Sequence, residues 1–307
     1  MTWLKLGRIF NPEVISGQGL SHALMPIVET LDAQNDLVRV YYSPRDAFRR
    51  SQLRYFEIDM KAPSKILRMA DKPLIEAGIL GAFDDSGITP GSFCNIGGKK
   101  AFFYTGWNLT VNVPMNNSIG ISFYDAHDGI FKRIGHGPLM TRTLHEPFSC
   151  ASPFVMYDPK KGIYWMWYAS MDSWKLQGEE RVHFYNIKVA ISLDGINWQR
   201  EAKVAIDYTH TGEYAFGRPF VMLENKIYKM WFAVRGKSYR IGYAESVDGW
   251  TWKRKDGLLN IKLSSEGWDS EMMEYPFIFD LKNKRYMFYN GNGYGASGIG
   301  LAVWEDN

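Results

Sequence analysis

The chain has 307 residues, 46% of them hydrophobic and 15% aromatic, and a formal net charge of +3. This composition excludes a disordered chain, and the scattered Lys and Arg give little support to a nucleic-acid partner. No run approaches the roughly 18 apolar residues of a membrane span. The N-terminal stretch MTWLKLGRIFNPEV also lacks a signal-peptide core, so we expect a cytoplasmic protein.

The first predicted element is a strand at TWLKLGRIF (2–10), in which an aromatic residue precedes basic ones. From residue 11 onward, a pattern of strands repeats about every 60 residues. Each repeat opens with an apolar strand that carries a proline near its start, where no ladder donor is needed. The opening strands are ALMPIVE (23–29), GITPGSF (87–93), CASPFVM (150–156), GRPFVML (217–223) and EYPFIFD (274–280).

A second strand, rich in aromatic residues, follows each opening strand across a polar turn. These are LVRVYYS (37–43), KAFFYTG (100–106), IYWMWYA (163–169), IYKMWFA (227–233) and RYMFYNG (285–291). Third strands come next, at LRYFEID (53–59), SIGISFY (118–124), IKVAISL (187–193), RIGYAES (240–246) and GIGLAVW (298–304). The continuous apolar character of the second strands is expected where both faces of a sheet are covered.

A short turn then leads to an outer strand, as in GYAESVDGWTWKRKD (242–256) and VAISLDGINWQREA (189–202). Asp-Gly is a strong hairpin signal, so Asp194 and Asp248 are interpreted as turn residues, as is Asp128 in the looser copy GISFYDAHDGIFKRI (120–134). The fifth repeat lacks this outer strand, and residues 2–10 have its pattern.

The repeats predict an all-β fold, a five-bladed β-propeller closed by an N-terminal strand that completes the last blade. We expect one domain over residues 1–307. The predicted blades are 11–80, 81–142, 143–207, 208–262, and 263–307 together with 2–10. Cys94 and Cys150 are expected to be buried free thiols. No cofactor or metal site is expected, although an ion in the axial channel is left open.

Loops that feed the innermost strands form one rim of a propeller, so the segments before each opening proline are the candidates for a site. Their polar residues are His22, Asp84, Asp85, His145, Glu146, Glu213, Arg218, Glu271 and Glu274. Carboxylates that meet in one funnel shift one another's pKa values, which suits glycoside chemistry by one acid and one base. Asp85 with Glu146, or Glu213 with Glu274, are the predicted catalytic pairs, with Asp84, Glu271, His22 and Arg218 binding substrate.

Structural alternatives apply to these candidates. Asp84 or Asp85 also suits a turn cap, and Glu213 also suits an ion pair with Arg218. Further residues are predicted to contact substrate. Arg45 and Asp46 follow a second strand and suit sugar hydroxyls or a phosphate, although a solvated turn with a local salt bridge is the alternative. Aromatic residues near the rim suit stacking on sugars, namely Trp107, Trp174, Trp268 and Tyr275. Asn290 lies in the glycine-rich NGNGYGASGIG (290–300).

The opening strands, the aromatic second strands and the hairpins SLDGINW (192–198) and SVDGWTW (246–252) resemble those of five-bladed propeller glycosidases. These are the arabinanases and xylosidases of glycoside hydrolase family 43, the invertases and the mannoside phosphorylases of family 130. The resemblance to family 43 implies an Asp in blade one, an Asp in blade two and a Glu in blade three. Asp85 and Glu146 match the latter two, whereas blade one has Ser21 and His22. The Arg45-Asp46 pair resembles the invertase Arg-Asp-Pro without its proline.

Two hypotheses follow. The first is an enzyme that cleaves or transfers a glycosidic bond by carboxylate chemistry; a phosphate held by Arg45 and Arg218 would instead favour a phosphorylase or a transferase that uses an activated sugar. The second is a non-catalytic carbohydrate-binding propeller, which the missing acid of blade one favours. The partner in either case is a carbohydrate or an activated sugar, with no nucleic acid and no membrane span.

Overall fold

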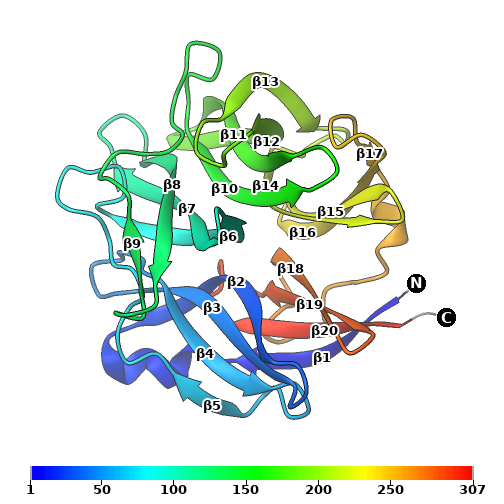
Figure 1. The fold of residues 1–307 in the computed structure, drawn as a ribbon. Helices are drawn as coiled ribbons and strands as arrows, with labels where there is room; N and C mark the ends of the chain where they lie inside the picture. The colour runs from blue at the N-terminus through cyan, green and yellow to red at the C-terminus, as the bar shows by residue number, and fades with distance from the viewer. Residues whose placement is uncertain (1, 306–307) are drawn as a thin grey trace.

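β-Strands dominate the computed structural model of the protein, which describes residues 2–305. The sheets stand around a common centre, and each turns its first strand toward it (Figure 1). Three antiparallel sheets have four strands each. The first has β2 (Ser21–Asp32), β3 (Leu37–Arg45), β4 (Arg54–Asp59) and β5 (Ile66–Met69). The second has β6 (Gly87–Ile96), β7 (Lys99–Leu109), β8 (Met115–Asp125) and β9 (Ile130–Arg133). The third has β18 (Glu274–Leu281), β19 (Lys284–Asn290), β20 (Ile299–Glu305) and β1 (Thr2–Phe10).

The middle of the chain forms an eight-stranded sheet with two antiparallel halves. One half has β10 (Cys150–Asp158), β11 (Ile163–Gln177), β12 (Glu180–Ser192) and β13 (Gln199–Ile206). The other has β14 (Ala215–Glu224), β15 (Ile227–Arg235), β16 (Tyr239–Ser246) and β17 (Lys253–Arg254). A single parallel pair, Tyr185 with Ala215, joins the halves.

The innermost strands form a closed ring. β2 contacts β6, β6 contacts β10, β10 contacts β14, β14 contacts β18, and β18 contacts β2 again. The N-terminal β1 pairs with β20 and so adds the fourth strand to the C-terminal sheet. This pairing confirms the prediction that residues 2–10 supply the strand that the last repeat lacks. It brings the two ends of the chain into one sheet (Figure 1).

The second strands are buried on both faces, as their continuous apolar sequences predict. Trp165 and Trp167 of β11 are fully buried. They pack edge-on against Trp250 and Trp252, with ring centroids 5.1 and 5.8 Å apart. These two tryptophans belong to the turn that follows β16, in the other half of the sheet. The tryptophans of the SVDGWTW hairpin therefore join adjacent four-stranded units.

The Ser-x-Asp-Gly hairpins are held by their own side chains. The Asp194 carboxylate accepts hydrogen bonds from the backbone N–H groups of Ile196 and Asn197, and the Ser192 hydroxyl accepts one from Gly195. Gly195 has φ 76°, a left-handed conformation that glycine adopts without strain. Asp248 accepts the corresponding bonds in the next copy. The prediction that these aspartates are turn residues is confirmed.

The remaining features are minor ones. Both cysteines are free thiols; Cys150 is buried and Cys94 is partly exposed. The helical segments of the described chain are two short 3-10 helices, η1 (Pro12–Gln18) and η2 (Asp256–Leu258). Within residues 2–305, no helix has the length and apolar character needed to cross a membrane.

Candidate functional site

β-Bulges at the opening prolines aim side chains toward the ring centre. The ladders of β2, β10, β14 and β18 all shift register at this point. The residues just before the prolines, Met25, Ser152, Arg218 and Tyr275, have φ between 51 and 56°. A residue before proline normally adopts an extended backbone, so this conformation is strained and the surrounding ladder must maintain it. Bulges of this kind redirect side chains, and Met25, Ser152 and Tyr275 all line a cavity.

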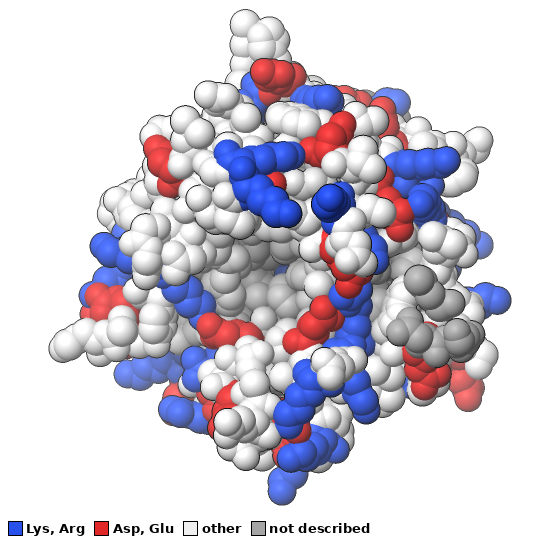
Figure 2. Space-filling model, turned by 45° about the vertical axis from the view of Figure 1, so that its right-hand side comes forward, with Lys and Arg blue, Asp and Glu red and all other residues white. Residues whose placement is uncertain are grey.

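This cavity of about 480 Å³ lies at the edge of the sheets where first strands begin and second strands end. Tyrosines, apolar residues and three arginines dominate its lining, and no Asp or Glu of residues 2–305 lines it. On the face drawn in Figure 2, the molecule is hollowed near its middle, with mostly uncharged surface in the hollow and both signs of charge around it. Of the predicted site residues, the cavity brings together Arg45, Trp107 and Tyr275.

The three arginines of the cavity are Arg45, Arg49 and Arg235. None of their guanidinium groups donates a hydrogen bond or forms an ion pair within the described chain, whereas most other arginines donate at least one hydrogen bond. Arg235 lies over the rings of Tyr214, Tyr239 and Tyr294, 5.2 to 5.7 Å from their centroids. Unpaired guanidinium groups in a cavity are suited to bind a carboxylate or phosphate.

A wall of tyrosines faces these arginines. The hydroxyl groups of Tyr185 and Tyr239 are hydrogen-bonded to each other, and the Tyr239 ring lies 6.2 Å from Tyr275. His183 stacks on Tyr185 at 5.2 Å. Burial, together with the charge of Arg235, lowers the pKa of His183 to about 4. The imidazole is therefore neutral at neutral pH.

Glu274 is a carboxyl group enclosed beside this wall. It is fully buried, and neither of its carboxyl oxygens has a hydrogen-bond partner within residues 2–305. Its electrostatic neighbours include Arg45 and Arg235, and its charge acts in turn on Tyr239 and Tyr275. Burial raises the pKa of Glu274 well above its usual value, against smaller opposing effects of Tyr275 and the arginines. This carboxyl keeps its proton to a higher pH than an ordinary Glu does.

Four of the other rim acids are engaged in a repeated arrangement that we call the clasp: a rim carboxylate, an aromatic residue of the second strand and a basic residue of the outer strand. In the β6–β9 sheet, Asp84 accepts hydrogen bonds from Tyr104 (3.1 Å) and Arg133 (2.8 Å). In the β10–β13 half, Glu146 accepts one from Tyr168 (3.0 Å) and pairs with Arg200 at 2.6 Å. Burial alone would raise the pKa of Glu146, but Arg200 and the hydroxyl donors outweigh it and lower that pKa.

The clasp recurs in the remaining sheets with one exception. Glu213 pairs with Arg254, whose guanidinium lies over Phe232. Asp269 accepts hydrogen bonds from Tyr289 (3.0 Å) and Lys5 (2.7 Å). In the β2–β5 sheet a neutral Gln18 takes the place of the acid and accepts from Arg54 of β4. The predicted pairing of Glu213 with Arg218 is not formed, because Arg254 occupies the carboxylate.

Arg218 crosses the centre of the ring instead. It is fully buried, and its guanidinium donates to the carbonyl oxygens of Gly91 and Pro26, in β6 and β2. Burial lowers its pKa to about 9. The charged guanidinium thus joins three innermost strands, and its positive charge is unfavourable to a second cation close by.

The other predicted residues lie outside the cavity lining. Asp85 caps its loop by accepting from the Gly81 N–H and the Ser86 hydroxyl. Asp46 accepts from Arg50 in the turn after β3. The Asn290 amide is buried and donates to the carbonyl oxygens of Ala23 and Gly298.

His22 and Glu271 complete the predicted set. The partly exposed His22 ring is hydrogen-bonded to the Ser21 hydroxyl, and burial lowers its pKa. Glu271 is exposed, and its backbone N–H donates to the Asn292 side chain.

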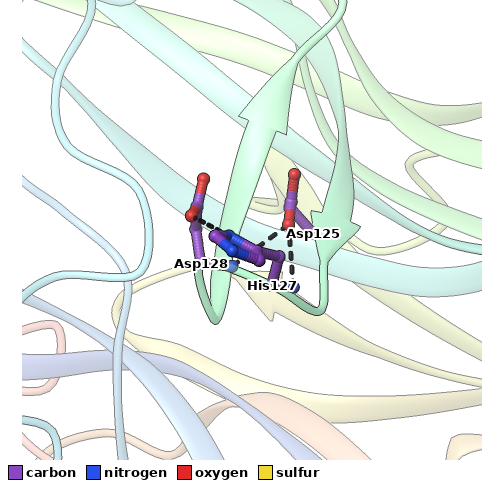
Figure 3. A group of neighbouring side chains, drawn as sticks. All are labelled: Asp125, His127 and Asp128. Atoms are coloured by element: carbon purple, nitrogen blue, oxygen red, sulfur yellow. Dashed lines mark hydrogen bonds and ion pairs between the residues drawn. The ribbon is translucent and has the colours of Figure 1, made fainter.

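One group of side chains has the composition of a metal site. Asp125, His127 and Asp128 lie together in the hairpin between β8 and β9 (Figure 3), with potential ligand atoms within 4.8 Å of one another. Lys132 already supplies a cation there, because it pairs with Asp125 at 2.7 Å and also with Asp128. The Asp125 carboxylate also accepts the backbone N–H of His127. These contacts stabilise a hairpin and need no metal.

The sequence analysis missed Arg49, Arg235, His183, Tyr239 and Tyr294 as cavity residues. The sequence does contain a signal for Arg235. In an antiparallel sheet, the end of the second strand lies beside the start of the first strand, at one edge of the sheet. Arg235 pairs with Ala215 at the start of β14, as Arg45 pairs with Ser21 at the start of β2. Both strands end in Arg, in LVRVYYSPR and IYKMWFAVR. Aligning these ends would have placed Arg235 at the position equivalent to Arg45, at the same edge of its sheet.

The whole chain aligns with two curated mycobacterial proteins. "Uncharacterized protein Rv1502" and "Uncharacterized protein MT1551", from two strains of Mycobacterium tuberculosis, are each 39% identical over 306 residues, which cover 100% of this chain and 100% of each relative. The chain belongs to their family. No family model matches it.

Solved structures show which fold this family has. A structure described as a glycoside hydrolase superposes with a TM-score of 0.77 at 16% identity, over 99% of this chain and 92% of that protein. A thermostable family-43 glycoside hydrolase gives 0.66 at 16% identity, over 93% and 91%. A protein from the GH130 family of mannoside phosphorylases gives 0.62 at 15%, over 93% and 84%. The family therefore has the fold of the β-propeller glycosidase superfamily.

Proposed function

We propose that the protein is a carbohydrate-active enzyme that cleaves or transfers a glycosidic bond in the cavity, with Glu274 as its proton donor. The observation that carries this proposal is the buried Glu274 carboxyl, which has no hydrogen-bond partner within residues 2–305 and lies near two cavity arginines that act on it, Arg45 and Arg235. A general acid must hold its proton at the working pH, and burial favours the protonated form of Glu274 by raising its pKa. The shared fold with glycoside hydrolases supports the same reaction class.

Glu274 reaches the cavity through its neighbours. It directly precedes Tyr275, whose side chain the β18 bulge turns into the cavity. A fully buried carboxyl needs a small displacement of this tyrosine to contact a leaving oxygen. The strained backbone of Tyr275, with φ 56°, is the element that we expect to move.

The cavity arginines favour a reaction with an anionic sugar or with phosphate. Hydrolysis by two carboxylates requires a second acid across the sugar, and no Asp or Glu of residues 2–305 lines the cavity to supply it. Phosphorolysis needs one acid only. A phosphate oxygen attacks the anomeric carbon, the bond to the leaving oxygen breaks, and Glu274 protonates that oxygen. Arg45, Arg49 and Arg235 would hold the phosphate, or the phosphate of an activated sugar donor in a transfer reaction.

We propose a structural role for Asp84, Glu146 and Glu213, and a turn-capping role for Asp85. Each of the first three is paired with an outer-strand arginine and lies outside the cavity lining. We also propose that the chain forms one domain of five blades, with the halves of the eight-stranded sheet counted separately, because the ring of innermost strands closes without a gap.

Turnover assays test the catalytic proposal. The purified protein is assayed against a panel of nitrophenyl glycosides and oligosaccharides, with and without inorganic phosphate. Glu274→Gln is expected to lower kcat by about 100-fold or more, the contribution of a general acid. The matched control is Glu271→Gln, because Glu271 is an exposed acid of the same segment and is expected to leave kcat unchanged.

Two results contradict the proposal. Full activity of Glu274→Gln would show that Glu274 is not the proton donor. Absence of turnover on the whole panel, together with binding of a glycan, favours the non-catalytic carbohydrate-binding alternative. Phosphate dependence of the activity separates phosphorolysis from hydrolysis.

A further inference from the structure

The β11–β12 hairpin reaches beyond the cavity that it lines. Its cavity residues Met171, His183 and Tyr185 lie in the middle of the hairpin, and pairing continues outward to Gln177 and Glu180. In the adjoining half of the sheet, the β15–β16 pairing ends at Arg235 and Tyr239, both at the cavity itself. One hairpin therefore extends the cavity wall toward solvent.

One face of this extension continues the cavity lining. Trp174 pairs with His183, and Leu176 pairs with Arg181, so alternation along β12 places Arg181, His183 and Tyr185 on a single face. Trp174 lies edge-on to His183 at 5.1 Å. Leu176 is 71% exposed, although it is a large apolar residue. From Tyr185 to Arg181 the face spans about 14 Å at the rise of a β-strand.

The opposite face braces the hairpin. Phe184 packs on Tyr214 at 5.6 Å, and the Lys175 ammonium lies 4.4 Å from the Phe184 centroid. The Tyr185 N–H donates to the carbonyl of Tyr214, which lies just before β14. The Phe184 face thus packs against the neighbouring part of the sheet. The opposite face, with Trp174 and His183, remains free beside the opening of the cavity.

The chemistry of this face matches a sugar chain. Trp174 is partly exposed, and its indole N–H has no acceptor within residues 2–305. Aromatic side chains that offer a ring and a polar edge pack against the apolar face of a sugar while bonding its hydroxyls. His183 beside it is neutral, because burial and Arg235 lower its pKa to about 4. Trp174 and His183 thus form an uncharged aromatic surface that suits a sugar ring, and Arg181 lies beyond it toward the end of the hairpin.

We propose that Trp174, His183, Leu176 and Arg181 form a subsite for the part of a glycan chain that lies outside the cavity. The ligand is then an oligosaccharide or a longer glycan, with one end in the cavity and at least one further sugar on the hairpin. This inference rests on the proposed function for the sugar in the cavity, and it adds the size and position of the substrate.

A glycan array tests the subsite without requiring turnover. Wild-type protein is first applied to an array that includes β-1,2-mannooligosaccharides and cellotriose. The best-bound oligosaccharide and its monosaccharide units are then titrated by calorimetry into wild type, Trp174→Ala and Lys175→Ala. Trp174→Ala is expected to bind the oligosaccharide about fivefold to tenfold more weakly, the value of one aromatic contact, and to bind the monosaccharides as wild type does. Lys175→Ala changes the braced face of the same hairpin and is expected to behave as wild type.

Three outcomes overturn the subsite: no oligosaccharide of the array binds, Trp174→Ala binds as wild type does, or both variants lose affinity together with a fall in Tm. The Glu274→Gln variant separates this test from the proposed reaction. Its binding of the oligosaccharide is expected to match wild type. If it also retains full turnover, the catalytic proposal fails while the subsite is judged by Trp174→Ala alone.

Discussion

Acidic side chains of the same rim have different surroundings in the clasps and at Glu274. Glu146 and Glu274 are both buried carboxyls, seven residues before the opening Pro153 and two residues before the opening Pro276. Glu146 receives Arg200, Lys188 and hydroxyl donors, and its pKa is lowered. Glu274 receives no hydrogen bond within the described chain, and its pKa is raised. The difference in pKa follows from the partners that the fold brings to each carboxyl.

The largest effect is expected at a clasp. Glu146→Ala leaves Arg200 and Lys188 buried without their counter-charge, which costs about 3–5 kcal/mol of the free energy of unfolding. Urea denaturation measures this loss, with the exposed Glu271→Ala as a control expected to stay within about 0.5 kcal/mol of wild type. A Glu146→Ala variant as stable as the control would make the clasp dispensable.

The cavity arginines give the next effect. Arg45→Gln and Arg235→Gln each remove a charged donor, worth about 1.5–3 kcal/mol, so binding of inorganic phosphate is expected to weaken about 10- to 150-fold. Calorimetric titration with phosphate measures it. Arg142→Gln, at an exposed arginine already bonded to Asn116, serves as the control. Equal affinity in all four proteins would refute the anion site.

The pH dependence of stability sharpens the contrast between the two carboxyls. Because the pKa of Glu274 is raised by folding, the folded state binds more protons, and its contribution to stability falls as pH rises above the unfolded value of about 4.3. Glu274→Gln removes this loss, so its stability relative to wild type is expected to grow by up to about 1.4 kcal/mol per pH unit in that range.

Glu146 has the opposite sign. Its lowered pKa gives stability that is present above about pH 4.3 and is lost as pH falls through the folded value.

Urea denaturation of wild type and Glu274→Gln between pH 4 and 8 measures how the difference in stability between these two proteins depends on pH. A difference that stays constant with pH would mean that Glu274 is ionised like an ordinary Glu.

The smallest effect concerns His183. NMR titration is expected to show its ring neutral down to about pH 4, as burial and the charge of Arg235 lower its pKa. Arg235→Gln removes the second of these causes, so the pKa of His183 is expected to rise while staying below the usual 6.5. An unchanged value would show that burial alone sets it.

Much of the fold follows from local sequence. Proline at the start of a strand, continuous aromatic runs and Asp-Gly turns each act within a few residues, so the strands, the hairpins and the closing strand at 2–10 were all predictable. The acids before the prolines were also visible, and so were the basic residues of the outer strands, such as Arg200 after Trp198. Their pairing was not predicted, because about fifty residues separate Glu146 from Arg200 along the chain.

The sequence by itself thus determined a repeating all-β chain whose rim contains many charged side chains. Only the tertiary structure decided which of these charges are neutralised and which face the cavity. Pairing depends on distance in space, and a bulge of one residue decides whether a side chain such as Tyr275 points into the cavity or into the sheet. Glu274 has no hydrogen-bond partner and Arg235 has no ion pair within residues 2–305, and both facts depend on the arrangement of the chain in space.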